Sequence, residues 1–413
     1  MKKPLMNDEQ LQYEESYYMS ESESEIEKIM PEILDISGEI YRLAELGSSE
    51  LKSSQILADY LEKKGFKVEK PYAGMKTAFR ATRNRGSPSV GFLAEYDALP
   101  NGHACGHNLI AAWAVGSAVL LSRMYDDISV TVLGTPSEEG IGEYAGSKAI
   151  MADRGYADGV DFYFGFHPDD QWGVGSGALA DLTLDLEFIG KAAHGADSPE
   201  QGVNALDAAV TTYMAINNLR GWAKNDRHLV IGMIITQGGK ATNVIPDVAE
   251  IQVEIRSTSS EFVGIFAEKV ERTARSIAES YGASLECRRI TPLYRDYLPN
   301  VRLDSILYEE LLKVGLKPHN NHSSQYIPSG STDEANISWV APTGHLDMPI
   351  GYRGISGHSE EFRQAAEPFR NAENLRIAIL ATVRSALSAS KHIQDIRDEY
   401  HAQRKHRGEL QRD

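Results

Sequence analysis

Cysteine is scarce in this chain, which has only Cys105 and Cys287 among its 413 residues. Two cysteines cannot form a disulfide framework, which excludes the class of small disulfide-rich secreted proteins. Long apolar runs are also lacking, because the longest, Ile110–Leu121, is too short to span a bilayer and is typical of a buried helix. The first residues, MKKPLMNDEQ, contain two lysines with no apolar segment behind them, so no signal peptide is expected. We therefore expect a soluble cytoplasmic protein.

Basic residues are the minority of the charged side chains, with 42 lysines and arginines against 59 aspartates and glutamates and a net charge of −17. So acidic a surface repels phosphate backbones, and neither nucleic acid nor a membrane is an expected partner. The chain also lacks the G-x-G-x-x-G, Walker and G-x-S-x-G patterns, which mark dinucleotide binding, phosphate binding and serine hydrolysis. Its 42% hydrophobic content is ample for a large core.

The first half of the chain alternates between strand and helix patterns. Apolar residues three or four apart from Ile26 to Leu43 predict a helix behind a frayed polar lead at 1–20, and a second helix ends at Gly65. The β-rich runs that follow are Thr77–Arg83, Ser89–Glu95, Ile128–Thr135 and Asp161–His167, and the helical patterns between them are His107–Met124 and Ala145–Arg154. This alternation predicts an α/β sheet covered by helices on both faces.

The pattern changes after residue 180. Strict alternation from Leu182 to Phe188 predicts a half-buried strand, and a helix, two strands, a helix and a strand follow up to Ile290. This βαββαβ order is that of the ferredoxin-like fold. The α/β pattern then resumes and ends in a predicted helix over Ala366–Ser390. The expected domains are a catalytic domain in two parts (21–180 and 293–390), an inserted domain (181–292) and a charged tail (391–413).

Chemically reactive side chains follow the ends of three predicted strands. Cys105 and His107 come after the second strand, Glu138 and Glu139 come directly after the third, and His167 ends the fourth. In an open α/β sheet, ligands bind at the edge where the carboxyl ends of the strands meet. A set of thiolate, imidazole and carboxylate groups suits zinc or another divalent ion of similar softness. The sequence therefore predicts a metal site at this edge.

Each of these motifs also has an ordinary alternative. The C-x-H pair is equally compatible with a buried thiol beside a structural histidine, and TPSEEG (135–140) with a solvated acidic turn. A redox role for Cys105 is a further alternative, although the chain has no C-x-x-C motif. Adjacent glutamates point in different directions, so one can bind a metal while the other serves as the general base of a metallohydrolase.

Seven short motifs resemble the M20 family of metallopeptidases and amidohydrolases, most closely its subfamily D. They are H-A-C-G-H-N at 103–108, P-S-E-E-G at 136–140, G-F-H-P at 165–168, G-K-A-A-H-G at 190–195, T-N-V-I-P-D at 242–247, S-T-D-E-A-N-I-S-W at 331–339 and G-H-S-E-E-F at 357–362. Much of the subfamily ends the first motif in Asp. Asn108 in that place looks like the branch of p-aminobenzoyl-glutamate hydrolases and of the dipeptidases called aminoacylase-1-like protein 2.

The resemblance implies a zinc-peptidase-like catalytic domain with an inserted lid and dimerisation domain, and two divalent ions per subunit, zinc or manganese. Cys105 would bridge the ions, and the other ligands would be His107, Glu139, His167 and His358. Glu138 would be the general base. The implied reaction is hydrolysis of an N-acyl or N-aroyl amino acid, or of a dipeptide, to release a free amino acid. The alternative is a catalytically silent binding or scaffold protein on the same fold.

The lid motifs imply three further site residues and a partner. By resemblance His194 and Asn243 approach the site from the lid, and His194 usually reaches the neighbouring subunit's site to stabilise the oxyanion, so a homodimer is expected. Arg256 matches a lid position that could grip a substrate carboxylate. His103 is expected to be structural or to support a ligand. His319, His322 and His345 are expected in surface loops, with the substrate pocket as the alternative.

Overall fold

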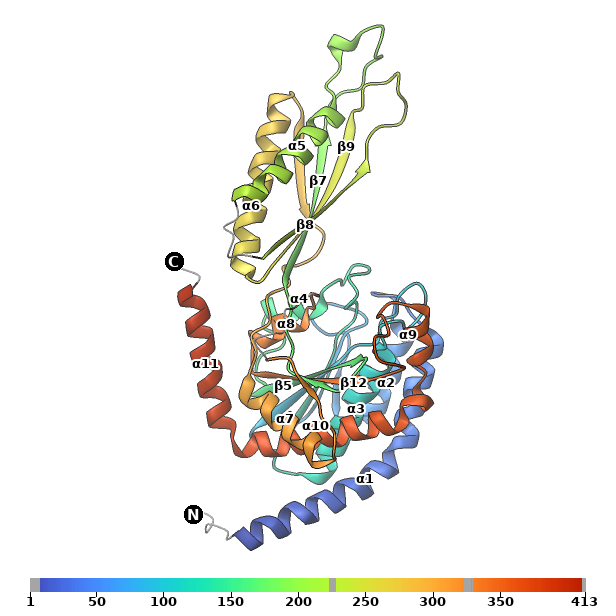
Figure 1. Ribbon diagram of the computed structural model, residues 1–413. Helices are drawn as coiled ribbons and strands as arrows, with labels where there is room; N and C mark the ends of the chain where they lie inside the picture. The colour runs from blue at the N-terminus through green and yellow to red at the C-terminus, as the bar shows by residue number, and fades with distance from the viewer. Residues whose placement is uncertain (1–7, 223–227, 323–327, 329, 411–413) are drawn as a thin grey trace. The chain divides into compact units, whose positions relative to one another are not determined.

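The computed structural model describes residues 8–222, 228–322, 328 and 330–410. The chain forms two compact units, of which the second is built from Gly177–Tyr297 and a short return segment that ends at Asn336. The first unit contains the rest of the described chain (Figure 1). No helix among the described residues is long and apolar enough to cross a membrane.

An eight-stranded sheet organises the first unit, in the order β1-β2-β4-β3-β5-β12-β6-β11. The strands are β1 (Lys67–Glu69), β2 (Phe79–Arg83), β3 (Ser89–Ala94), β4 (Ser129–Gly134), β5 (Phe162–Asp169), β6 (Gly173–Val174), β11 (His319–Asn320) and β12 (Thr343–Pro349). The central strands β4, β3, β5 and β12 run parallel to one another. Their carboxyl ends therefore meet at one edge, as the sequence predicts.

Helices cover both faces of this sheet, which confirms the expected α/β class. They are α1 (Asp8–Leu43), α2 (Leu51–Lys63), α3 (His107–Met124), α4 (Ser147–Asp153), α7 (Val301–Lys313), α8 (Glu334–Ser338), α9 (Glu360–Ala365), α10 (Ala372–Lys391) and α11 (Ile393–Leu410). Phe92 and Phe166 point to the face packed by α3 and α10, whereas Leu93 and Tyr163 belong to a second core with Met151 of α4. Alternate strand residues thus serve two cores.

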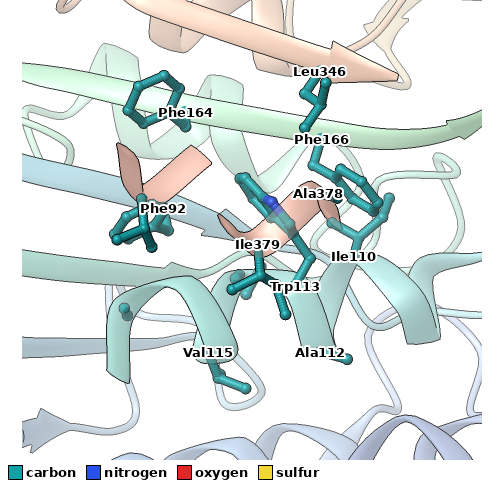
Figure 2. Close-up of a cluster of buried hydrophobic side chains, with 14 of the residues drawn as sticks. Phe92, Ile110, Ala112, Trp113, Val115, Phe164, Phe166, Leu346, Ala378 and Ile379 are labelled. Atoms are coloured by element: carbon teal, nitrogen blue, oxygen red, sulfur yellow. The ribbon is translucent and has the colours of Figure 1, made fainter. Parts of the chain in front are cut away.

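Helix α3 lies at the centre of the larger core. Its residues from His107 to Ser122 are all buried, as expected for a helix that is apolar on every side. Trp113 stacks on Phe166 with ring centroids 5.0 Å apart and meets Phe92 edge to face. Its indole N–H donates to Thr382 of α10 at 3.1 Å. Figure 2 shows this cluster, which fixes the helix whose first residue is His107.

The chain ends differ from the sequence expectation. Helix α1 already begins at Asp8, whereas a frayed lead is expected up to residue 20; its first residues, DEQLQYEE, are mostly good helix formers that extend the buried part outward. Residues 1–7 and 411–413 lie outside the described residues. The predicted helix at 366–390 begins at Ala372, because Pro368 opens a short 3₁₀ turn (Pro368–Asn371) before it.

The second unit has the predicted βαββαβ order. Its elements are β7 (Ala180–Ile189), α5 (Ala205–Leu219), β8 (Leu229–Gln237), β9 (Val248–Ser257), α6 (Ser260–Ser280) and β10 (Ser284–Arg289). The antiparallel sheet has the order β10-β7-β9-β8. Burial alternates along β9, since one face of the sheet packs against α5 and α6. This is the ferredoxin-like arrangement.

Candidate metal centre

The loop after β3 leads into helix α3 and delivers Cys105 and His107 to the sheet edge. Gly106, between them, has a left-handed φ of +79°, and a Cβ there would lie 2.8 Å from a side-chain carbon of Pro168. Glycine is therefore required for this close approach. With no side chain at 106, the chain can turn so that both flanking side chains reach the same site.

Three other loops complete the edge. Glu138 and Glu139 follow β4 after Ser137, which has a φ of +59°. His167 lies near the end of β5. His358 precedes α9 with a φ of +65°, and its N–H donates to the Ala104 carbonyl at 2.9 Å. That bond joins the loop of His358 to the loop of Cys105.

These side chains form two groups of metal-ligand atoms that share one thiol. Cys105, His107 and His167 form one group, and Cys105, Glu139 and His358 form the other; within each group the ligand atoms lie within 4.8 Å of one another. Cys105 Sγ is 3.3 Å from His167 Nε2, and His358 Nε2 is 3.5 Å from Glu139 Oε1. The structure thus brings together all five residues that the sequence predicts as ligands.

A buried carboxylate fixes the tautomer of His107. Asp97 Oδ1 lies 3.0 Å from His107 Nδ1, and its Oδ2 accepts the Glu139 N–H at 3.1 Å. With the proton on Nδ1 donated to Asp97, Nε2 presents its lone pair to the site, as a metal-binding imidazole does. Sequence reasoning missed Asp97, although it follows a buried strand just as the two glutamates do.

The electrostatics of the site centre on the thiol. Burial opposes ionisation of Cys105, but the nearby His167 and His107 outweigh it and hold the pKa of the thiol well below its usual value. Burial lowers the pKa of His167, yet the Cys105 charge outweighs that effect and raises it to about 10. Burial and the same thiol raise the pKa of Glu139 to about 8. The site is therefore built around a thiolate that attracts cations.

The residues present fit divalent ions. Within the described part of the chain, three buried atoms of this region have no hydrogen-bond partner: His107 Nε2, Glu139 Oε1 and Glu95 Oε2. Leaving a buried polar atom unpaired costs about 1–3 kcal/mol, so three together point to a missing common partner. Sulfur, nitrogen and oxygen donors around one thiolate suit zinc, with manganese as a harder alternative.

The three predicted lid residues lie in the second unit. His194 is exposed, and its Nδ1 accepts the N–H groups of Ala196 and Asp197 at 3.2 and 3.0 Å, so Nε2 carries the ring proton. The Gly195 N–H donates to the Asn243 carbonyl at 2.9 Å, which holds the loops of His194 and Asn243 side by side.

Arg256 is already paired within the second unit. Its guanidinium lies 3.2 Å from Asp181 and 2.7 Å from Glu254. A substrate carboxylate would compete with these two partners, which the sequence alone did not reveal. The carboxylate-binding role of Arg256 therefore stays a prediction.

Other polar residues singled out in the sequence have structural partners. His103 is buried, with Nε2 3.0 Å from the Ile40 carbonyl, and burial lowers its pKa to about 4. His322 pairs with Asp304 at 2.6 Å. The expectation of a surface loop is wrong for His345, which is buried in β12. Asn108 donates to Ser37 and to the Ala366 carbonyl, both at 3.0 Å, so these bonds tie α3 to α1 and to the segment that leads into α10.

Glu50 supports the loop of the two glutamates, and its ionisation should set part of the pH dependence of stability. Its Oε1 accepts the Ser137 N–H at 2.9 Å, while burial and then the charge of Asp97 raise the pKa from 4.5 to about 7. Between those values the folded protein binds a proton that the unfolded chain releases, so stability falls as pH rises. We expect the Glu50→Gln variant to lose this slope, by about 3 kcal/mol between pH 4.5 and 7.5.

Denaturant unfolding of the chelator-treated protein across this pH range measures the effect. The exposed Glu62 of α2 provides the control, because Glu62→Gln should leave the pH dependence unchanged. Parallel pH profiles for the wild type and Glu50→Gln would contradict the assignment.

Comparisons with known proteins agree with this geometry. An M20-type peptidase dimerisation domain is recognised over residues 181–282. The chain is 32% identical to the Xaa-Arg dipeptidase of Homo sapiens over 355 residues, which cover 80% of this chain and 79% of that protein. It is 30% identical over 339 residues to a p-aminobenzoyl-glutamate hydrolase polypeptide of Escherichia coli (strain K12), covering 75% of this chain and 69% of that protein.

Solved structures share the fold. An aminobenzoyl-glutamate utilization protein from Klebsiella pneumoniae matches with a TM-score of 0.68 at 18% identity, covering 89% of this chain and 98% of that one. The YXEP protein of Bacillus subtilis, a dinuclear metal binding peptidase from the M20 family, matches with a TM-score of 0.58 at 20% identity, covering 86% and 99%.

The fold and these relatives define the class of the protein, a metal-dependent hydrolase of amide or peptide bonds. The chain belongs to the M20 family, which confirms the family that its motifs predict. Nothing in the comparisons supports the alternative of a silent scaffold.

Proposed function

We propose that this protein cleaves a dipeptide, or an N-acyl or N-aroyl amino acid, and releases a free amino acid. Two divalent ions, zinc or manganese, would be held by Cys105, His107, Glu139, His167 and His358. The observation that carries the proposal is the pair of three-residue ligand groups that share the Cys105 thiol. A thiol common to both groups is what a ligand that bridges two ions requires.

Glu138 is the proposed general base. When bound, the ions polarise the scissile carbonyl and lower the pKa of the attacking water. Glu138 Oε2 lies 3.8 Å from His107 Nε2, and its side chain is 14% exposed, so it borders the ligands and remains open to substrate. In this position Glu138 takes a proton from the attacking water and donates it to the leaving amine.

His194 is the proposed oxyanion donor. Because its Nδ1 accepts two backbone N–H groups, its Nε2–H is available to donate to the negative oxygen that develops during hydrolysis. Asn243, in the adjacent loop, is proposed to hold the same part of the substrate. Both residues are exposed on the second unit.

We further propose a homodimer formed through the second unit. The edge strand β8 exposes Ile234 and Ile235, and α5 exposes Met214, which is 61% accessible. An unpaired strand edge with exposed apolar side chains favours pairing with another chain. The peptidase dimerisation domain recognised over residues 181–282 supports the same choice.

Charged substitutions on this face test the dimer. Sedimentation should show that Ile234→Glu with Met214→Glu converts a dimer into a monomer. If His194 acts in the partner's site, that monomer should also lose turnover. A strictly monomeric wild type with full activity would rule out the shared site.

A hydrolysis screen tests the overall proposal. The substrates should include dipeptides with a C-terminal arginine, since the human relative is an Xaa-Arg dipeptidase, together with N-acetyl and N-aroyl amino acids. We expect release of a free amino acid with zinc, manganese or cobalt, and loss of activity after chelation that metal restores. Metal-loaded protein that cleaves none of these classes would contradict the proposal. The cytoplasmic location also stays a prediction, supported by two free cysteines.

A further inference from the structure

Glu95 and Lys148 form a buried ion pair directly behind the metal centre. Lys148 is fully buried on α4, Glu95 is 4% exposed just after β3, and Lys148 Nζ lies 3.0 Å from Glu95 Oε1. Glu95 Oε2 is turned the other way, 3.4 Å from His107 Nε2. One oxygen of this carboxylate therefore faces a lysine, and the other faces a proposed metal ligand.

The contact between Glu95 and His107 joins two atoms that are both acceptors. Asp97 takes the Nδ1 proton of His107, so Nε2 presents a lone pair, and a carboxylate oxygen also presents lone pairs. Neither Nε2 nor Glu95 Oε2 has a hydrogen-bond partner among the described residues. Two buried acceptors that face each other repel unless a cation lies between them.

The spacing is that of two ligands of one ion. Donor atoms about 2.1 Å from a tetrahedral ion stand about 3.4 Å apart, which equals the separation of His107 Nε2 and Glu95 Oε2. Glu95, His107 and Glu138 also form a third group whose ligand atoms lie within 4.8 Å of one another. The carboxylate thus lies at ligand distance on the side of His107 that Glu138 also faces.

We propose that Glu95 is a further ligand of the ion held by His107, and that Lys148 fixes it in place. The inference rests on the proposed two-metal function and adds a sixth ligand to the five named above. Lys148 holds the outer oxygen of the carboxylate, which leaves the inner oxygen aimed at the ion. Because a positive charge is fully buried beside it, the carboxylate can stay ionised where water does not reach.

The rival explanation gives Glu95 a supporting role only. A proton on His107 Nε2 would also satisfy both acceptors, with Glu95 as a hydrogen-bond partner that binds no metal. The two explanations differ in the coordination of the ion, which the visible spectrum of Co²⁺ reports directly.

A cobalt titration of the chelator-treated full-length protein distinguishes them. For Glu95→Gln we expect one of the two bound ions to bind at least about tenfold more weakly with a changed visible spectrum, while the other ion is unaffected. Lys148→Met should weaken the same ion. Glu95→Asp, which keeps the charge but shortens the side chain, should reproduce the Glu95→Gln result, so the test does not depend on one variant folding.

The controls separate this inference from the function on which it rests. Glu310→Gln alters another buried glutamate, paired with Lys313 on α7, and should leave both cobalt affinities unchanged. Circular dichroism of the metal-free variants checks folding. An unchanged cobalt spectrum in Glu95→Gln, with or without weaker binding, would overturn the ligand assignment. A wild type that binds no cobalt would instead overturn the proposed function.

Discussion

Replacing Glu138 with Gln should lower kcat by about 10²–10⁴-fold, the range that a positioned general base contributes. The amide keeps the size of the side chain and its place 3.8 Å from His107, but it cannot accept a proton from water. Because Glu138 is not among the five proposed ligands, metal content should remain that of the wild type. Steady-state kinetics on a substrate found in the screen, with metal analysis of the same sample, measures both effects.

The same loop provides a matched control for Glu138. Glu143 is exposed a few residues further along, so Glu143→Gln makes the same chemical change away from the ligands and should leave kcat unchanged. Full turnover of Glu138→Gln on every cleaved substrate would remove Glu138 from the mechanism. A parallel loss of metal would instead make Glu138 a ligand.

Replacing Cys105 with Ala should cost the protein both ions, because this thiol belongs to both ligand groups. Loss of a residue that supports a metal typically lowers affinity 10–100-fold, and loss of a shared ligand should reach at least the upper end of that range for each ion. Activity should fall with metal content. Cys105→Asp should recover part of both, since a carboxylate can also bridge two ions. Metal analysis after dialysis, together with kcat, measures the loss.

Cys287 provides the control for thiol chemistry. It lies on β10 in the second unit, where burial raises its pKa to about 11, so it is a poor metal ligand and a poor nucleophile. Cys287→Ala should keep two ions and the wild-type rate. If Cys105→Ala behaves the same way, the bridging assignment fails. Rapid alkylation of Cys105 in metal-loaded protein would favour a redox thiol instead.

Much of this site could be predicted because the sheet is parallel. Once the strand runs are recognised, the residues that follow them must meet at one edge, which places Cys105, Glu139 and His167 together. His358 is different, since it lies in a loop before α9 and follows no central strand directly. Its place in the site was expected only from the G-H-S-E-E-F motif.

Side-chain pairing could not be predicted. Sequence spacing gives no sign that Lys148 of α4 would be buried against Glu95, or that Arg256 would already pair with Asp181. Such partners are set by tertiary packing between elements that are distant along the chain. Asn108 illustrates the same limit, because it marks a branch of the family while its amide bonds to α1.

Helix α3 makes ion binding and folding parts of one equilibrium. Its first residue is the proposed ligand His107, and its second turn carries Trp113 into the centre of the largest core (Figure 2). An ion that binds the folded chain and not the unfolded one adds about 1.4 kcal/mol of stability for each tenfold excess over its dissociation constant. Cellular metal supply would then govern how much of this enzyme survives as well as how fast it works.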